Sequence, residues 1–521
     1  MHATTPGRHR LAAALAILLL GLAGALTATP RAAAAPPDPM AFAENLDRDA
    51  IAADLAALQR IADENGGNRA DGTPGGDATV EYLATRLAEA GYDVQRQTFT
   101  TRAGHESVNL IAETPTGRTD NVIMLGAHWD GVEAGAGMND NASGTAALLQ
   151  VATELADFGA LNNQVRFAFW GAEETGLEGS RHYVGELSED EVDQLVVYYN
   201  YDMIGSPNYL IGVENGKAET YNDKPLADGS AQAMDVQSGY FDAIGQPWQP
   251  SEMCCTDYNA FHDAGVPIGG LYTGGREAPK TEEEAAKFGG TAGEFPDPNY
   301  HSAGDDLANV SLEGVGINAG VMAYAAASLG LSSEPINGVA PPAAKLDPSA
   351  ARPGAEITIS GSGFVPGEPI EITIGDQQVA TVRAGEDGAL DARATVPDDA
   401  PAGATTVTIA QDPLAPIELD LEVESVPAPS PTGSPSSTAP SSPTSPSSPP
   451  GGDDTTAPTA SAEPTATASP TAVPSQTTAA PAPRPRPPGV PLASTGGPAL
   501  GAAALGVAAL LAGAMLLRRR T

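Results

Sequence analysis

The chain has 521 residues, of which 41% are hydrophobic and 46 are proline, so it has room for two or three domains but is not apolar throughout. Its 66 acidic residues outnumber 26 basic ones, which gives a formal net charge of −40. That balance argues against nucleic acid and anionic membranes as partners. It would suit binding of Ca2+, but the sequence has no Asp-x-Asp-x-Asp-Gly loop to specify a calcium site.

Residues 1–35 have the organisation of a secretory signal peptide. Arg8 and Arg10 precede an apolar run from Leu11 to Leu26, and Ala33-Ala34-Ala35 supplies the small residues of a cleavage site. A transmembrane anchor is the alternative, but the run is short and ends in a cleavage-like stretch. We therefore expect a secreted protein whose mature chain begins near residue 36.

Residues 36–333 alternate predicted helices and strands, which is typical of an α/β domain. Helices are expected at Ile51–Glu64, Thr79–Ala90, Ser143–Phe158 and Val315–Leu329. Strands are expected at Val94–Thr100, Val108–Ala112, Val122–Leu125, Val165–Trp170 and Leu195–Tyr199. The pattern predicts a three-layer α/β fold with a mixed sheet.

Histidine and acidic residues follow the apolar runs of this domain, where open α/β sheets place their sites. They are His128, Asp140, Glu173, Glu174, Asp202 and His301. Two imidazoles and several carboxylates are the ligands that a pair of zinc ions needs, and a glutamate left over beside them could activate a water molecule. The pattern indicates a hydrolase.

Each motif is weak when taken alone. The stretch Asp140–Gly144 would more often be a turn that caps a helix, and Glu173-Glu174 would more often be a solvated surface. A lone histidine is usually a hydrogen-bonded bystander, which is our interpretation of His105, His182 and His262. The order of the motifs favours the metal site, and the sequence has neither the His-Glu-x-x-His nor the Gly-x-Ser-x-Gly signature of other hydrolases.

The same motifs resemble the M28 family of co-catalytic zinc aminopeptidases, in particular its secreted actinobacterial leucine-type members. The resemblance covers residues 38–331. Its motifs are His128-Trp129-Asp130, Asn139–Gly144, Trp170–Leu177, Asp202-Met203 and Tyr300-His301. It implies a zinc-peptidase fold and an aminopeptidase that acts on peptides with free, chiefly apolar N-terminal residues.

The resemblance also implies which residues hold metal. His128 and Asp202 would bind one Zn2+, Glu174 and His301 would bind a second, and Asp140 would bridge the two. Two zinc ions would polarise the scissile carbonyl, activate a bridging water and anchor the free α-amino group.

Three further residues take roles from the resemblance. Glu173 would be the general base that accepts a proton from the bridging water and later donates it to the leaving amine. Tyr300 would donate a hydrogen bond to the oxyanion. Asp130 would orient the ring of His128 with its carboxylate.

The sequence departs from its relatives at the cysteines. In those relatives a disulfide flanks the Tyr-His motif, at the positions of Asn299 and Gly304 here. The two cysteines of this chain are adjacent instead, Cys254 and Cys255, and Cys255 replaces an arginine that reaches the substrate. Because we expect a secreted chain and it has no other cysteine, we predict a disulfide between these adjacent residues, with a free thiol pair as the alternative.

Two other functions stay open at this point. One is a different amide chemistry on the same fold, such as a glutaminyl cyclase; cyclases of this fold use one zinc, so a complete five-ligand set argues against this reading. The other is a surface-binding protein that has lost activity. Loss of a ligand or of the base would indicate it, and none is missing here.

Residues 344–424 read as a small all-β domain. Short β-forming runs, Ile357–Ile359, Ile370–Ile374, Val379–Val382 and Thr406–Ile409, are separated by Gly, Pro and Asp turns. The stretch Gly361–Phe364 resembles Ig-like modules of bacterial surface proteins. A spacer is the simpler reading, with wall or glycan binding as the alternative.

Residues 425–491 form a Pro/Ser/Thr-rich tract that cannot bury a core, so we expect a disordered stalk that spans the cell wall. Residues 492–521 resemble a sortase sorting signal: Leu492–Gly496, an apolar stretch from Pro498 to Leu517, and then Arg518–Arg520. The expected partners are sortase and cell-wall peptidoglycan, on the surface of a Gram-positive bacterium. A simple membrane anchor is the alternative.

Overall fold

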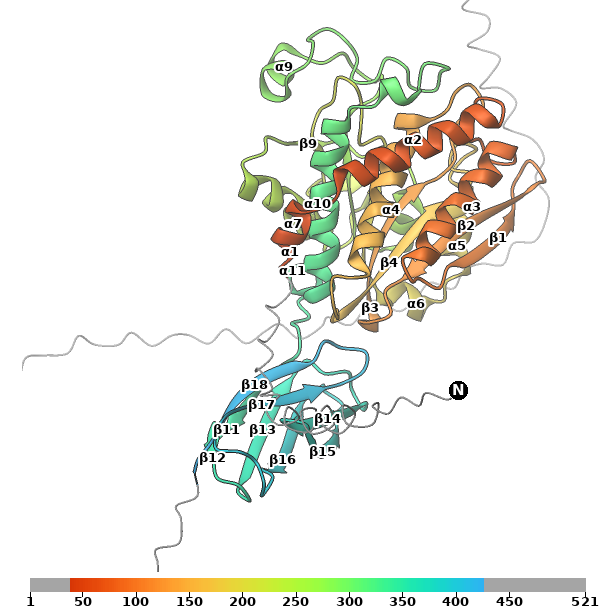
Figure 1. Cartoon of the computed structure of the whole chain (residues 1–521). Helices are drawn as coiled ribbons and strands as arrows, with labels where there is room; N and C mark the ends of the chain where they lie inside the picture. The colour runs from red at the N-terminus through yellow and green to blue at the C-terminus, as the bar shows by residue number, and fades with distance from the viewer. Residues whose placement is uncertain (1–37, 426–521) are drawn as a thin grey trace, which may run out of the picture. The chain divides into compact units, whose positions relative to one another are not determined.

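A computed structural model describes residues 38–425 of the chain (Figure 1). Within this range an α/β part is followed by an all-β part. The expected signal peptide, the sorting signal and all but the first residue of the expected stalk lie outside the described residues.

An eight-stranded mixed sheet forms the centre of the α/β part, in the order β1-β2-β4-β3-β5-β10-β6-β9. Its strands are β1 (Gln95–Thr100), β2 (Glu106–Glu113), β3 (Arg118–His128), β4 (Asn163–Trp170), β5 (Leu195–Tyr201), β6 (Gly212–Glu214), β9 (Gln249–Ser251) and β10 (Ile268–Tyr272). β4, β3, β5 and β10 pair in parallel, and so do β6 and β9. β1 with β2, β2 with β4, and β10 with β6 pair antiparallel. A separate hairpin joins β7 (Thr220–Tyr221) to β8 (Lys224–Pro225).

Helices cover both faces of this sheet, as the alternation of its side chains requires. Ile123 and Leu125 of β3 belong to a large core with the helices of one face, whereas Val122 and Met124 belong to a smaller core on the other face. A strand with both faces buried is expected to be apolar throughout, and every residue of β5 is buried. The α/β part therefore has the three layers that the sequence predicts.

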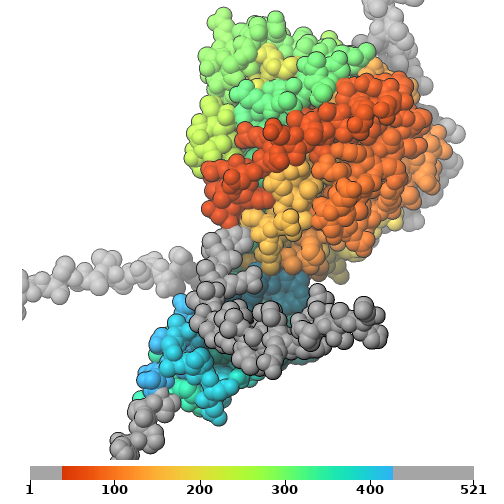
Figure 2. All heavy atoms as spheres, viewed as in Figure 1, coloured from red at the N-terminus to blue at the C-terminus, as the bar shows by residue number. Residues whose placement is uncertain are grey.

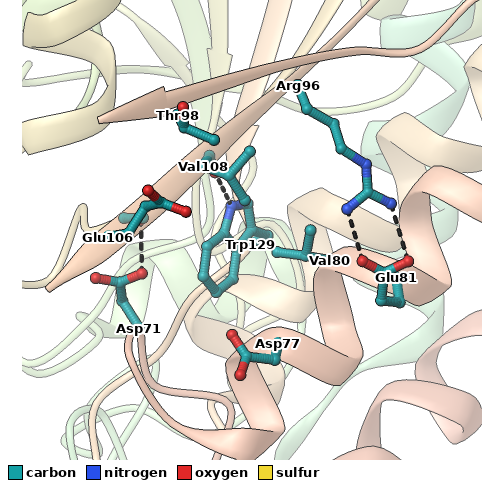
Figure 3. Close-up of a pocket in the computed structure, with 10 residues that line it drawn as sticks. Asp71, Asp77, Val80, Glu81, Arg96, Thr98, Glu106, Val108 and Trp129 are labelled. Atoms are coloured by element: carbon teal, nitrogen blue, oxygen red, sulfur yellow. Dashed lines mark hydrogen bonds and ion pairs between the residues drawn. The ribbon is translucent and has the colours of Figure 1, made fainter. Parts of the chain in front are cut away.

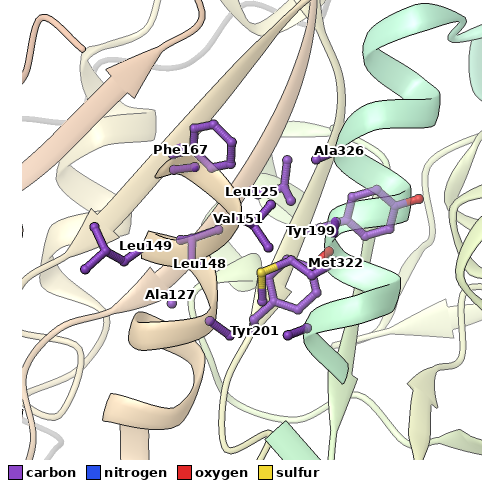
Figure 4. Close-up of a cluster of buried hydrophobic side chains, with 14 of the residues drawn as sticks. Leu125, Ala127, Leu148, Leu149, Val151, Phe167, Tyr199, Tyr201, Met322 and Ala326 are labelled. Atoms are coloured by element: carbon purple, nitrogen blue, oxygen red, sulfur yellow. The ribbon is translucent and has the colours of Figure 1, made fainter. Parts of the chain in front are cut away.

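The larger core gathers helices far apart in the sequence. Figure 4 shows side chains of β3, β4 and β5 meeting those of α4 (Ser143–Leu155) and α10 (Leu312–Leu331). In the space-filling view, α2 (Arg48–Glu64) and α3 (Pro74–Glu89) cover one face in red and orange (Figure 2). The remaining helical elements are α1 (Pro39–Glu44), η1 (Met138–Ala142), α5 (Glu178–Glu186), α6 (Glu189–Gln194), α7 (Ser230–Ile244), α8 (Tyr258–Ala264), α9 (Glu282–Phe288), η2 (Leu307–Asn309) and α11 (Glu334–Asn337).

The prediction that α3 begins at Thr79 is wrong by five residues, because the helix begins at Pro74. The side chain of Thr73 caps it by accepting a hydrogen bond from the Gly76 backbone at 3.3 Å, and proline is preorganised for the first helical position. Glycine is needed at position 75 because a Cβ there would lie 1.9 Å from the Asn68 carbonyl oxygen.

The helix α10 is long and apolar enough to cross a membrane by length and composition. However, 78% of its most apolar window is buried inside the structure. It is longer than the predicted Val315–Leu329 because Ser311 caps it through a hydrogen bond from Gly314 N, which moves its start to Leu312. We therefore describe it as a core helix of the α/β part.

The all-β part consists of two sheets around one core. One sheet contains β11 (Ala343–Asp347), β13 (Glu356–Ser362) and β16 (Leu390–Thr395). The other contains β12 (Ala350–Ala351), β14 (Pro369–Ile374), β15 (Gln377–Arg383), β17 (Gly403–Ala410) and β18 (Ile417–Val423). Alternate residues such as Ile357 and Ile359 fill the core, and all four predicted runs lie in strands. The Ig-like assignment itself stays a prediction.

Candidate metal centre

The fold brings together all six histidine and acidic residues that the sequence singles out. Because β3, β4 and β5 are parallel, their carboxyl ends lie at one edge of the sheet. His128 ends β3, the turn after β4 carries Glu173 and Glu174, and Asp202 follows β5. Asp140 lies in η1 before α4, and His301 lies in the loop between α9 and η2.

Asp140 lies between the two histidines. Its Oδ1 is 3.3 Å from His128 Nε2 and its Oδ2 is 3.0 Å from His301 Nε2. His128 Nε2 also lies 3.2 Å from Asp202 Oδ1, and His301 Nε2 lies 3.0 Å from Glu174 Oε2. One carboxylate thus faces both imidazoles, and each imidazole faces one further carboxylate.

These side chains form two groups that could each hold a metal ion. His128, Glu173 and Asp202 form one, Asp140, Glu174 and His301 form the other, and the donor atoms of each group lie within 4.8 Å of one another. Imidazole nitrogens and carboxylate oxygens are zinc ligands. Glu174 Oε1 is buried without a hydrogen-bond partner. A carboxylate oxygen that ligates a cation would be expected in such a state. The residues present therefore fit zinc.

The electrostatics of the site favour cations. Hydrogen bonds to Asp140 and Glu174 raise the pKa of His301 to about 10. Burial raises the pKa of Glu174 to about 7, with the nearby charge of Asp140 acting in the same direction. Burial opposes ionisation of Asp140, but its hydrogen bonds to His128 and His301 lower its pKa to about 2. Clustered carboxylates that hold protons on imidazoles would equally attract divalent ions.

Asp130 lies against the ring of His128. His128 Nδ1 is 3.1 Å from the backbone carbonyl of Asp130 and 3.5 Å from its carboxylate. That carboxylate also accepts the backbone N–H of Glu173 at 3.2 Å. Asp130 therefore connects the end of β3 to the turn that carries Glu173. The predicted role of Asp130 in orienting the His128 ring stays a prediction.

Glu173 belongs to the group of His128 and Asp202, and Tyr300 lies next to His301 of the other group. Burial raises the pKa of Glu173 above its usual range, and nearby carboxylates add to the shift. The ring of Tyr300 stacks on that of His301 with centroids 3.8 Å apart. Burial raises the pKa of Tyr300, so its hydroxyl keeps its proton and can act as a donor.

The sequence did not reveal two residues that support the site. Thr256 donates its hydroxyl to Asp202 Oδ2 at 2.7 Å. Arg69 is fully buried, and its guanidinium donates to the backbone carbonyls of Ala136, Trp129 and Gly137. Arg69 donates only to backbone carbonyls, which leave no signal in a sequence.

The sulfur atoms of Cys254 and Cys255 are bonded at 2.04 Å. Both residues are exposed, and the backbone N–H of Cys255 donates to the Tyr221 hydroxyl at 3.1 Å. Because Thr256 follows directly and contacts Asp202, the pair lies close to the metal groups.

The three bystander histidines lie outside the metal groups. His105 Nε2 contacts Asp71 Oδ2 at 2.5 Å, His182 stacks on Phe99, and His262 Nε2 contacts a backbone carbonyl at 2.9 Å. Each has a local structural partner.

A separate cavity of about 230 Å³ lies between α3 and the strands β1 and β2. Figure 3 shows the carboxylates of Asp71, Asp77 and Glu106 around the ring of Trp129, with the Arg96–Glu81 ion pair at one side. No proposed metal ligand lines this cavity.

Comparisons with known proteins agree with this geometry. The model of peptidase family M28 matches residues 109–326. Leupeptin-inactivating enzyme 1 of Streptomyces exfoliatus is 38% identical over 331 residues, which are 62% of this chain and 71% of that protein. Leucine aminopeptidase 2 of Trichophyton rubrum is 44% identical over 246 residues, 47% of this chain and 49% of that protein. This chain therefore spans about half the length of the fungal relative.

The solved structure of an aminopeptidase from Aneurinibacillus sp. strain AM-1 is also similar, with a TM-score of 0.44 and 17% identity over 55% of this chain and 95% of that one.

The fold and the clustered histidines and carboxylates define a zinc-dependent hydrolase. Within that class, the chain belongs to peptidase family M28 and is a metallo-aminopeptidase homologue.

Proposed function

We propose that the protein is a dinuclear zinc aminopeptidase that removes N-terminal, chiefly apolar, residues from peptides. The observation that carries this proposal is the position of Asp140, whose two oxygens face His128 and His301 at 3.3 and 3.0 Å. A carboxylate that faces two imidazoles from opposite oxygens is suited to bridge two ions. The apolar preference is supported by relatives named leucine aminopeptidase.

In this proposal His128 and Asp202 would hold one zinc ion, Glu174 and His301 would hold the second, and Asp140 would be shared between them. When bound, two zinc ions would polarise the scissile carbonyl, lower the pKa of a water molecule and anchor a free amine. Asp130 and Thr256 support this arrangement through their hydrogen bonds to the Glu173 backbone and to Asp202.

The remaining steps belong to the side chains of the chain. Glu173 accepts a proton from the attacking water and transfers it to the leaving amine. Burial raises the pKa of Glu173, which favours retention of the proton between the two transfers. Tyr300, protonated and stacked on His301, donates a hydrogen bond to the oxyanion that develops on the substrate carbonyl.

A panel of aminoacyl chromogenic amides tests the proposed function. We expect hydrolysis of leucyl and other apolar amides, loss of activity with a chelator, and its return with zinc. N-acetylated peptides should resist cleavage, and cutting of blocked peptides would move the protein to endopeptidase or deacylase chemistry. Formation of pyroglutamate from N-terminal glutamine would favour a cyclase. Measuring hydrolysis with added calcium, in the presence and in the absence of zinc, would distinguish an effect of calcium from that of zinc.

We also propose that the enzyme is secreted and anchored covalently to the cell wall. The support is the sequence alone: a signal-peptide pattern at residues 1–35 and the Leu492–Gly496 motif followed by an apolar stretch and Arg518–Arg520. Sortase would join the Thr495 carbonyl to a peptidoglycan amine and release the C-terminal segment. The mature chain would then run from about residue 36 to Thr495, with the all-β part between enzyme and wall.

A further inference from the structure

Two loops supply ligands that face one another, and neither ligand lies within a β-strand. Asp140 lies in η1, and His301 lies in a segment between α9 and η2 that has neither helix nor strand. Sheet pairing therefore cannot fix the distance between them. The structure must position them by other contacts.

The carboxylate of Asp305, which is 2% exposed, holds the Asp140 loop by its backbone. Its Oδ1 accepts the N–H of Asn139 at 2.8 Å, and its Oδ2 accepts the N–H of Asp140 at 3.0 Å. The backbone carbonyl of Asp305 accepts a further hydrogen bond, at 3.3 Å, from Met138. One residue of the His301 loop thus fixes three consecutive residues of the Asp140 loop.

A second buried carboxylate, Asp297, extends this contact. It is fully buried and accepts hydrogen bonds from the side-chain amides of Asn139 at 2.7 Å and Asn309 at 2.9 Å, and from the Asn299 backbone at 2.8 Å. The Asn309 amide also donates to Asp305 at 3.1 Å, and Asn299 Nδ2 donates to the Asn309 side chain at 2.8 Å. We call these five residues the two-loop network.

The position of the two-loop network excludes a direct role as metal ligands. Asp297 and Asp305 accept N–H groups through both of their oxygens, and neither belongs to the two groups that could hold metal among the described residues. The network surrounds His301 in the sequence, with Asp297 and Asn299 before it and Asp305 and Asn309 after it.

We propose that the two-loop network is a positioning device: it presents His301 to Asp140 and Glu174 and thereby sets the affinity of the second zinc ion. This inference rests on the proposed function, because it assigns that ion to those three residues. Removing an outer hydrogen-bond partner of a metal site typically weakens metal binding about 10–100-fold. The effect should fall on one of the two ions only.

Asp297→Asn in the full-length protein is the first test. The substitution keeps the shape of the side chain, but it replaces one hydrogen-bond-accepting oxygen by an amide NH2 group, which can only donate. Zinc binding to the apo-protein is measured by competition with a chromogenic chelator, beside wild type, His301→Ala and the exposed control Asp93→Asn. We expect two tight zinc ions for wild type and Asp93→Asn. In Asp297→Asn one ion should stay tight and the other should weaken about 10–100-fold.

The backbone offers a specific rescue. A Cβ built on Gly304 would lie 3.4 Å from Asn299 Cβ, close to the roughly 3.5–4.5 Å that a disulfide needs. Asn299→Cys with Gly304→Cys, added to Asp297→Asn and oxidised, should tether the loop and restore tight binding of the second ion. A dithiol reductant should remove the rescue, while wild type with the same reductant controls for Cys254–Cys255.

The outcomes separate this inference from the proposed function. A wild type that binds fewer than two zinc ions overturns the proposed function. If wild type binds two ions and Asp297→Asn binds both as tightly, even with a lower unfolding midpoint, the network only stabilises the fold and the inference is wrong. Should Asp297→Asn fail to fold, Asn299→Ala, which removes one partly buried contact, decides between the same results with a smaller expected loss.

Discussion

At the scale of single residues, the site distinguishes two neighbouring glutamates. Glu174 Oε2 lies 3.0 Å from His301, in the group that Asp140 completes, whereas Glu173 lies in the other group, with His128 and Asp202. Because the proposed ligands are His128, Asp140, Glu174, Asp202 and His301, Glu173→Ala should keep both zinc ions but lose general-base catalysis, a fall in kcat of about 10²–10⁴-fold. Zinc content and kcat are measured on the same preparation. Near-wild-type kcat in the variant would show that another residue is the base.

The protonation of His301 predicts how the metal-free protein responds to pH. Hydrogen bonds to Asp140 and Glu174 raise its pKa from 6.5 to about 10. A raised pKa stabilises the folded state fully below about pH 6.5, and this stabilisation is lost as the pH rises through about 10. The raised pKa of Glu174, about 7, acts in the same direction.

The free energy of unfolding of the metal-free protein should thus fall from about pH 6.5 to 10. Zinc binds neutral imidazole, so the loaded protein has no such proton to lose. Unfolding midpoints of both forms, measured at about pH 6 and about pH 9, should move apart as the pH rises. If the difference between the two unfolding midpoints becomes smaller from about pH 6 to about pH 9, the histidines of the metal-free site are not protonated as described.

Sequence could identify the proposed ligands because each lies in a distinctive motif, although only His128, Glu174 and Asp202 lie at or just after the end of a strand. It could not show that the Asp130 carboxylate, which lies 3.5 Å from the His128 ring, also accepts the backbone N–H of Glu173, because backbone contacts leave no signal in a sequence. Nor could the sequence show that Asp297 and Asn309 bind one another, because only an irregular loop brings their side chains together.

At the scale of elements, α4 shows what the periodicity could predict. The helical spacing of its apolar residues predicts a helix, and Leu148 is fully buried in the larger core. Predicted ends were less accurate: the helix ends at Leu155 rather than Phe158, and α3 begins at its threonine cap rather than after the glycines. Caps and close backbone contacts decide such ends, and periodicity does not report them.

Truncation of Leu148 tests this core. Leu148→Ala should lower the free energy of unfolding of the zinc-loaded protein by about 2–5 kcal/mol, because it leaves a cavity in a closed core. Leu312→Ala is the matched control, since Leu312 is 53% exposed and should change the free energy far less. Denaturant unfolding measures both. Equal effects would mean that α4 does not pack as described.

At the scale of the whole molecule, the sequence outside residues 38–425 predicts where the enzyme works. Covalent anchoring requires Thr495, so Thr495→Ala should leave the enzyme in the membrane fraction or in the medium. Muramidase digestion of cell walls, followed by an activity assay, compares the variant with wild type. If digestion releases no more wild-type enzyme than variant, the C-terminus is a simple membrane anchor.

The number of zinc ions bound per chain at full activity tests most directly the central claim, that the site is dinuclear. The metal-free protein is titrated with zinc while hydrolysis of a leucyl chromogenic amide is followed, and bound metal is measured at each point. We expect full activity at two zinc ions per chain, and neither His128→Ala nor His301→Ala should reach it at that ratio. Full activity at one ion per chain, or activity that survives complete removal of metal, would contradict a dinuclear site bridged by Asp140.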